Sequence, residues 1–233
     1  MSDATAPVIA LDGPGGSGKG TVGYKLAEKL NWHFLDSGSL YRILAFVANS
    51  KKLFTKDTDL ENTVNIDAIC KEALNFNLKF NSKILLDNKD ITNVIRTEQI
   101  GNLASKIAVV PQIRQALLES QRVFQKQPGL VADGRDMGTV VFPDASLKIY
   151  LTASAEVRAK RRLLQLQGAG IHVSLAELIC EIKARDDRDS NRIAAPLKPA
   201  KDAVIIDNSN LSINQVLEVA LRHYSKVFST SSI

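Results

Sequence analysis

The sequence has few of the features that mark secreted, metal-binding or membrane proteins. Only two of its 233 residues are cysteines, Cys70 and Cys180, which are too few for a disulfide framework and too far apart for a zinc site. Reduced cysteines are typical of cytoplasmic proteins, and we expect that location. No apolar run approaches the roughly 20 residues of a membrane span, and the opening MSDATAP lacks the basic flank and apolar stretch of a signal peptide. We therefore expect no membrane partner.

Aromatic residues are also scarce, at 6%, so aliphatic side chains must fill most of any core. The hydrophobic share of 45% and the charged share of 24% are close to the globular average, which argues against disordered and fibrous proteins. A length of 233 residues suits one domain, or one domain with an insert.

The chain carries a net charge of +5, which suits partners that bear phosphate, although a solvated surface alone would also explain it. There is no long Lys/Arg tract. The densest basic cluster is Lys160, Arg161 and Arg162. The charge pattern therefore gives no support for a nucleic-acid partner, and we expect none.

Short apolar runs alternate with amphipathic helical patterns along most of the chain. The runs predict buried strands at residues 8–11, 32–35, 130–132, 147–151 and 203–206. Helical patterns begin near Lys19, Ser39, Ala155, Leu175 and Ile213. Strands that alternate with helices predict an α/β fold, with a five-stranded parallel sheet between two layers of helices. Such sheets bind ligands at the carboxyl ends of their strands.

The strand–helix rhythm changes between about residues 65 and 103. An alternating segment at 76–80, a break at Asn81-Ser82 and an extended segment at 83–87 predict a small antiparallel hairpin. We interpret this region as a small α+β insert.

The predicted organisation is therefore a core of residues 1–64 and 104–233 with an insert at 65–103. Within the core, Gly168-Ala169-Gly170 interrupts a helix. This break predicts a short lid around residues 165–173.

A glycine-rich segment with the GxxxxGK spacing of a phosphate-binding loop is the strongest motif. It consists of Gly13, Pro14, Gly15, Gly16, Ser17, Gly18, Lys19, Gly20 and Thr21. A predicted strand precedes it and a predicted helix follows, so backbone N–H groups and the helix N-terminus can surround a phosphate. Lys19 adds a full positive charge at the β- and γ-phosphates. A glycine-rich turn with an incidental lysine is the alternative.

Gly20 departs from the general motif, which places Ser or Thr directly after the lysine. The hydroxyl that would bind Mg²⁺ is therefore displaced to Thr21, one residue later. Asp133, at the end of the predicted strand 130–132, is the second candidate for Mg²⁺, directly or through water.

Three further segments place charged or hydroxyl side chains where this fold binds ligands. The first, DSGSLYR at residues 36–42, lies at a predicted helix N-terminus and also reads as ordinary capping. The second, DGRD at 133–136, follows a core strand and also reads as a turn with a surface ion pair. The third, RDDRDSNR at 185–192, would bring Arg185, Arg188, Asp189 and Arg192 onto one helix face, where salt bridges on a solvated helix are the alternative.

Together these segments resemble the bacterial cytidylate kinase family. The resemblance rests on APVIALDGPGGSGKGT, LDSGSLYR, VADGRDMGTVVFPDASLKIYL and RDDRDSNR followed by APL, which occur in family order along nearly the whole chain. It implies a P-loop kinase that transfers the γ-phosphoryl group of ATP, with Mg²⁺, to CMP or dCMP. It also implies that the insert belongs to the monophosphate-binding region. We expect a monomer.

The resemblance implies a role for each matching residue. The ATP-binding set comprises residues 13–21 together with Arg158 and Arg162. The CMP-binding set comprises Ser37, Tyr41, Arg42, Ser105, Arg114, Arg135, Asp136, Arg185, Asp189 and Arg192. Lys19, Arg135, Arg185 and Arg192 would be catalytic. Within the CMP set, Asp136, Arg114 and Ser105 would contact the cytosine edge.

Two other functions fit parts of this pattern. A kinase for another small acceptor, such as UMP, dTMP or shikimate, would share the phosphate loop but not the set of Asp136, Arg114 and Ser105. A P-loop switch or nucleic-acid-binding ATPase would need a guanine-binding motif or a basic stripe, and the sequence shows neither. ADP release with each monophosphate in turn separates these possibilities.

Overall fold

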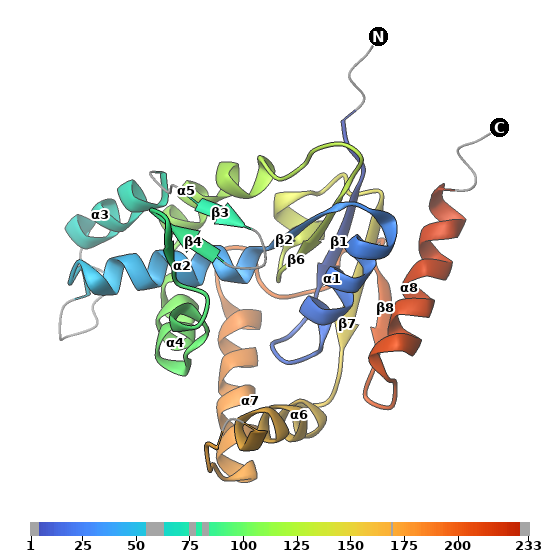
Figure 1. Cartoon of the computed structure of the whole chain (residues 1–233). Coiled ribbons are helices and arrows are strands. Elements are labelled where there is room, and N and C mark those ends of the chain that lie inside the picture. Colours follow the sequence, from blue (N-terminus) through green and yellow to red (C-terminus); the bar gives the residue numbers. More distant parts are fainter. Residues whose placement is uncertain (1–4, 55–62, 75–77, 81–83, 169, 229–233) are drawn as a thin grey trace. The chain divides into compact units, whose positions relative to one another are not determined.

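A computed structural model of the chain describes residues 5–54, 63–74, 78–80, 84–168 and 170–228. The chain forms two compact units (Figure 1). The first combines Met1–Asp36 with Phe124–Ile233, and the second is Ser37–Val123. No helix in the described ranges is long and apolar enough to cross a membrane.

The first unit is built on a parallel sheet of five strands with the order β2-β6-β1-β7-β8. These strands are β1 (Val8–Asp12), β2 (His33–Asp36), β6 (Leu130–Asp133), β7 (Leu147–Thr152) and β8 (Val204–Asp207). Each lies within one residue of its predicted position, so the α/β sheet expected from the sequence is confirmed. Leu11 on β1 is paired with Asp133 on β6, and Asp36 on β2 is paired with the same residue, so polar side chains gather at one edge.

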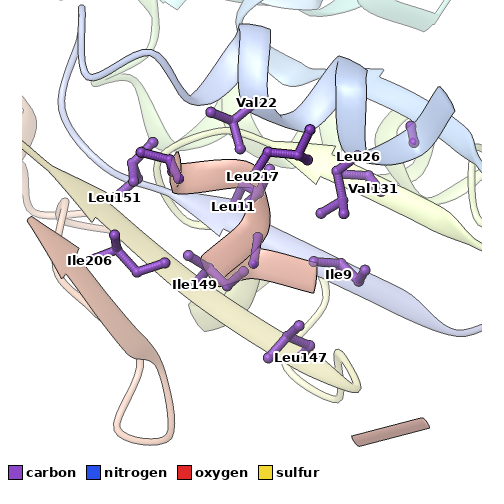
Figure 2. Packing of buried hydrophobic residues seen from close by; sticks show 13 residues of the cluster. Ile9, Leu11, Val22, Leu26, Val131, Leu147, Ile149, Leu151, Ile206 and Leu217 are labelled. Atoms are coloured by element: carbon purple, nitrogen blue, oxygen red, sulfur yellow. The ribbon is translucent and has the colours of Figure 1, made fainter. Parts of the chain in front are cut away.

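Aliphatic side chains fill the core of this unit, as the low aromatic content predicts. Helices α1 (Lys19–Leu30) and α8 (Ile213–Phe228) pack on one face of the sheet. Val22 and Leu26 of α1 and Leu217 of α8 meet strand residues such as Ile9 and Ile149 there (Figure 2). Every residue of β1 and β6 is buried, which shows that both faces of the central strands are covered.

The only tryptophan of the chain, Trp32, packs where α8 ends. Its ring meets Tyr224 edge to face at 5.7 Å and Phe228 at 5.5 Å between centroids. Gly129 leaves room for it, because a Cβ at that position would lie 2.3 Å from the indole. The start of β2 and the end of α8 are thereby joined in one aromatic cluster.

The remaining helices of the first unit are η2 (Met137–Val141), a short π-helix, and α6 (Ala155–Gly168) and α7 (Leu175–Asn191). The last two pack against each other. Ser174 and Glu177 form a capping box that starts α7. The segment predicted as a lid, residues 165–173, includes the end of α6 and the connection to Ser174, and Ala169 within it is outside the described residues.

The second unit consists mainly of α2 (Ser37–Ser50), α3 (Thr63–Leu74), α4 (Glu98–Ile107) and α5 (Pro111–Arg122), with the short 3₁₀-helix η1 (Val94–Arg96) before α4. Thr97 caps α4 through its side chain, and Pro111 is the first residue of α5, a position that proline favours. Helix α2 packs against α4, and α3 packs against α5.

The predicted hairpin is present in the second unit. Strand β3 (Leu78–Phe80) pairs antiparallel with β4 (Ile84–Leu86), and a short β5 (Lys89–Asp90) extends the sheet. Residues 76, 77 and 81–83 of the prediction lie outside the described residues. The compact unit is wider than the predicted insert of residues 65–103, because α2 on one side and α5 on the other bury their apolar faces within it. The monophosphate-binding role of 65–103 stays a prediction.

Leu26→Ala should destabilise the first unit, because Leu26 is fully buried between α1 and the sheet. Such a cavity typically costs about 2–5 kcal/mol. Lys25→Ala, on the exposed side of the same helix, should change the free energy of unfolding by less than about 0.5 kcal/mol. Urea unfolding of both variants measures the difference, and equal stabilities would contradict the packing of α1.

Candidate functional site at the carboxyl edge of the sheet

The phosphate-loop motif forms the expected connection between β1 and α1. Gly13, Gly16 and Gly18 have φ angles of 147°, 77° and 86°, which L side chains rarely adopt. A Cβ on Gly13 would also lie 2.0 Å from the carbonyl oxygen of Leu151. The glycines are therefore required by the course of the backbone, and the strand–loop–helix arrangement predicted for the motif is confirmed.

Lys19, the first residue of α1, is buried, and its ammonium group turns back over the loop. Its Nζ donates a hydrogen bond to the carbonyl oxygen of Pro14 at 3.3 Å and lies 3.7 Å from Oδ1 of Asp133. Burial lowers the pKa of the ammonium to about 8; the positive charges of Arg135 and Arg185 add to this, and Asp133 opposes it. The loop therefore holds a cation that lacks its usual hydration, which strengthens its attraction to an anion.

Asp133 ends β6 beside this lysine. Burial raises the pKa of its carboxyl group to about 6, against the attraction of Lys19, and the neighbouring Asp36 raises it further. Its Oδ1 is buried and accepts no hydrogen bond from the described residues. This oxygen can therefore accept a ligand, such as a cation or water.

Gly20 explains how Asp133 comes so close. A Cβ on Gly20 would lie 3.1 Å from Oδ2 of Asp133, which is tighter than ordinary contact. The space that a serine or threonine would fill is therefore next to a carboxylate. Thr21, the displaced hydroxyl, is exposed on α1, and its role as a metal ligand stays a prediction.

Arg135 and Arg185 both lie beside the phosphate loop. A Cβ on Gly15 would lie 3.4 Å from a terminal nitrogen of Arg135 and 3.7 Å from the guanidinium carbon of Arg185. Arg135 also donates from Nε to the carboxylate of Asp189 at 3.1 Å. The structure thus brings together the lysine and two of the arginines that the sequence predicts to be catalytic.

Arg192 and Asp136, two further residues of the predicted site, form an ion pair. Nη2 of Arg192 lies 3.7 Å from Oδ1 of Asp136, and both side chains are buried. Nε of Arg192 donates to the carbonyl oxygen of Ala195. Arg192 lies one residue beyond α7 and Arg188 is exposed, so the single helix face predicted for residues 185–192 is only partly formed. The helix ends too early to carry all four side chains.

Arg158 contacts the phosphate loop from α6. It donates from Nη1 to the carbonyl oxygen of Gly15 at 3.1 Å, from Nε to that of Ala153 at 2.9 Å, and pairs with the carboxylate of Asp186. These contacts hold the loop backbone and join α6 to α7. Arg162 is half-buried one turn later. Contact of either arginine with ATP stays a prediction.

The second unit holds the other predicted residues. Ser37, at the start of α2, donates its hydroxyl to Oε1 of Gln121 at 2.7 Å, and both are buried. Arg42 donates from Nη1 to the carbonyl oxygens of Ile95 and Thr97. This arginine thereby joins α2 to the start of α4.

Tyr41, Ser105 and Arg114 lie in the same unit. The guanidinium of Arg114 is 5.6 Å from the centre of the Tyr41 ring and also donates to the carbonyl oxygen of Ala108. Ser105 is buried on α4, and its Oγ has no hydrogen-bond partner among the described residues. A buried hydroxyl of this kind is suited to a polar ligand group.

Four polar side chains whose hydrogen bonds shape these sites were not predicted from the sequence. Gln121 accepts from Ser37, Asp186 from Arg158, and Asp12 from two backbone N–H groups. Asn208 donates to the carbonyl oxygen of Ser17 at 2.5 Å. Of these four side chains, only Asp12 could have been recognised from the sequence, because it lies at the end of a predicted strand directly before the glycine-rich motif.

No group of three or more His, Cys, Asp or Glu side chains in the described ranges is arranged to hold a metal ion. A metal here would therefore need ligands from a bound molecule as well as from Asp133, as in a metal–nucleotide complex.

Comparison with known proteins identifies relatives that match most of the chain. The sequence profile of the family described as cytidylate kinase matches residues 9–226. A protein named cytidylate kinase from Pseudomonas entomophila is 53% identical over 229 residues, covering 93% of this chain and 97% of that protein. One from Pseudomonas syringae pv. tomato is 54% identical over 220 residues, covering 91% and 93%. One from Salmonella choleraesuis is 50% identical over 225 residues, covering 94% and 96%.

The depressed pKa of Lys19 predicts a pH-dependent affinity for a nucleoside triphosphate. Below about pH 8 the ammonium is charged and attracts phosphate; above it, binding must take up a proton. The dissociation constant of ATP should therefore rise up to about tenfold per pH unit above pH 8. Calorimetric titration between pH 7 and 9.5 measures this change.

Lys19→Arg is the control, because a guanidinium stays charged throughout this range. Its dissociation constant for ATP should show no rise above pH 8. The same rise in this variant would assign the effect to another group.

Proposed function

The chain belongs to the cytidylate kinase family, and we propose that it transfers the γ-phosphoryl group of ATP to CMP or dCMP, giving ADP and CDP or dCDP. One observation carries the phosphoryl-transfer part of this proposal: the buried Lys19 lies against Asp133 in a glycine loop bordered by Arg135 and Arg185. Phosphoryl transfer spreads negative charge over peripheral oxygens, and fixed cations in a site with little water stabilise that charge.

We expect direct transfer with no covalent intermediate. The acceptor is a phosphate oxygen that is already nucleophilic, so the reaction needs no strong general base. Lys19 would follow the moving group, and Arg135, Arg185 and Arg192 would neutralise charge on the donor and acceptor phosphates. The rate would come from positioning and charge neutralisation.

Mg²⁺ fits the residues at this site. Asp133 offers a buried carboxylate oxygen without a hydrogen-bond partner among the described residues, at the end of the strand next to β1. We propose that Asp133 holds Mg²⁺ together with ATP oxygens and water, with Thr21 as a further candidate ligand. The ion would supply charge neutralisation at the β- and γ-phosphates.

The other residues of the predicted set would bind the monophosphate. We propose that Ser37, Tyr41, Arg42, Arg135 and Arg192 bind its phosphate, and that Arg185 and Asp189 lie near the ribose. In support, the hydroxyl of Ser37 donates to Gln121 and could donate to a phosphate oxygen instead if it rotated.

In the cell, we expect a cytoplasmic monomer without nucleic-acid or membrane partners.

The base would be distinguished by Ser105, Arg114 and Asp136. Cytosine presents an amino donor and two acceptors, so an acceptor-only carboxylate and a donor-only guanidinium match it. Uracil presents a carbonyl and an N–H at the same places, which would leave both charged groups facing the wrong partner. Each buried mismatch costs about 1–3 kcal/mol.

ADP release from ATP and Mg²⁺ should depend on a pyrimidine monophosphate and prefer CMP over UMP by at least about 10²-fold in kcat/KM. Asp136→Ala should reduce this preference, mainly by lowering kcat/KM for CMP. Asp144→Ala, an exposed carboxylate nearby in sequence, should leave it unchanged. ADP release without any acceptor would instead indicate an ATPase, and equal use of CMP and UMP would place base recognition elsewhere.

Lys19→Met should reduce turnover by about 10²–10³-fold or more, because the change keeps the length of the side chain and removes the charge beside the transferring group. Lys25→Met removes an exposed lysine from the same helix and should leave turnover unchanged. Steady-state ADP release and a thermal unfolding curve of each variant provide the measurement. Normal turnover by a folded Lys19→Met protein would exclude this role.

A further inference from the structure

The loop between β6 and η2 carries two side chains of the proposed site, Arg135 and Asp136. It is short, and both of its ends are attached to β1. The backbone N–H of Gly134 donates to the carbonyl oxygen of Leu11 at 3.0 Å. At the other end, the N–H groups of Met137 and Gly138 point at the side chain of Asp12.

Asp12 uses both carboxylate oxygens for this attachment. Oδ1 accepts from Met137 at 2.7 Å and Oδ2 from Gly138 at 2.8 Å. Hydrogen bonds to a carboxylate are about twice as strong as those between neutral groups. Since these bonds occupy the carboxylate in a buried position, Asp12 is arranged to hold backbone rather than to bind a metal.

The protein tolerates a cost to keep this carboxylate buried. Burial raises the pKa of Asp12 to about 6, and the nearby Asp136 raises it further, while the two backbone N–H groups and Lys19 oppose the rise. A neutral apolar side chain would avoid this cost but would leave two buried N–H groups without an acceptor.

Two glycines and a methionine make the attachment tight. A Cβ on Gly138 would lie 3.4 Å from Oδ2 of Asp12 and 3.1 Å from side-chain carbons of Lys148. A Cβ on Gly134 would lie 2.7 Å from the end of the Met137 side chain, which is fully buried. The loop is therefore packed closely, both against its own Met137 side chain and against Asp12 at the end of β1.

We propose that Asp12 is a positioning residue for base selection: by holding the N–H groups of Met137 and Gly138, it fixes the adjacent Asp136 in the place where that carboxylate recognises cytosine. This inference rests on the proposed reading of cytosine by Asp136. Asp136 directly precedes the two N–H groups, and its carboxylate is also aligned by Arg192. A small shift of the backbone at 137 and 138 would thus move the group that distinguishes an amino group from a carbonyl.

Asp12→Asn is the central variant. Asparagine has the same shape but only one oxygen, so one of the two N–H groups would face an NH₂ donor. We expect the dissociation constant of CMP, measured without ATP, to rise about tenfold, and that of UMP to change little. The CMP-over-UMP selectivity should therefore fall about tenfold, whereas the dissociation constant of ATP should change less than about threefold.

Asp207→Asn is the matched control. Asp207 also ends a strand of this sheet and accepts a backbone N–H, from Ser209 at 2.9 Å, but it is exposed and its loop carries no residue of the proposed CMP set. The dissociation constants of CMP and UMP should be unchanged in this variant. If Asp12→Asn does not fold, Gly138→Ala tests the same attachment, because its Cβ would lie 3.1 Å from side-chain carbons of Lys148 and 3.4 Å from Oδ2 of Asp12. A shift of the Gly138 backbone away from these atoms should lower selectivity in the same direction.

The outcomes separate this inference from the proposal on which it rests. If Asp136→Ala leaves selectivity intact, then Asp136 does not read the base, and both fail. If Asp136→Ala lowers selectivity but a folded Asp12→Asn protein keeps it, only the role of Asp12 is overturned. The role is also overturned if Asp12→Asn raises the dissociation constant of ATP as much as that of CMP, because Asp12 would then act on the phosphate loop. A selective loss of CMP affinity supports it.

Discussion

The carboxyl edge of the sheet depends on keeping charged groups away from water. Burial is the largest influence on the pKa values of Asp12, Lys19 and Asp133, and in each case it favours the neutral form. Asp12 is needed as the acceptor of two backbone N–H groups, but a fold selected for stability alone would replace Lys19 and Asp133 by apolar residues. Their presence is understandable if the charge serves a ligand that arrives later, since a cation already stripped of water need not reorganise when a phosphate binds.

The phosphate loop is held largely through its carbonyl groups. Arg158 binds the carbonyl oxygen of Gly15, Asn208 that of Ser17 and Lys19 that of Pro14. In a trans peptide the N–H of the following residue points away from the carbonyl. Fixing these oxygens therefore fixes the direction of the N–H groups of Gly15, Gly16 and Gly18. Side chains from α6 and from the residue after β8 thus control groups that lie more than a hundred residues earlier in the chain.

Much of the fold could be predicted from the sequence, and less of the site. The five strands were predictable because each is a short apolar run bounded by polar or glycine residues, and the glycine loop because its spacing has a specific backbone purpose. The partners of the arginines were not predictable. Contact of Arg158 with ATP stays a prediction. Its contacts with Ala153, Gly15 and Asp186 were not predicted, because which acceptor an arginine finds depends on tertiary packing. The end of α7 before Arg192 was missed for the same reason, as helical spacing alone does not show where a helix stops.

The single tryptophan gives this two-unit protein a built-in reporter. Trp32 lies in the first unit, half-buried against Tyr224 and Phe228. Indole emission shifts to longer wavelength when water reaches the ring, and no other indole is present in the chain. The emission spectrum therefore follows the junction of β2 and α8, whereas circular dichroism averages over the helices of both units. Where the two signals diverge during unfolding, one unit has lost its structure before the other.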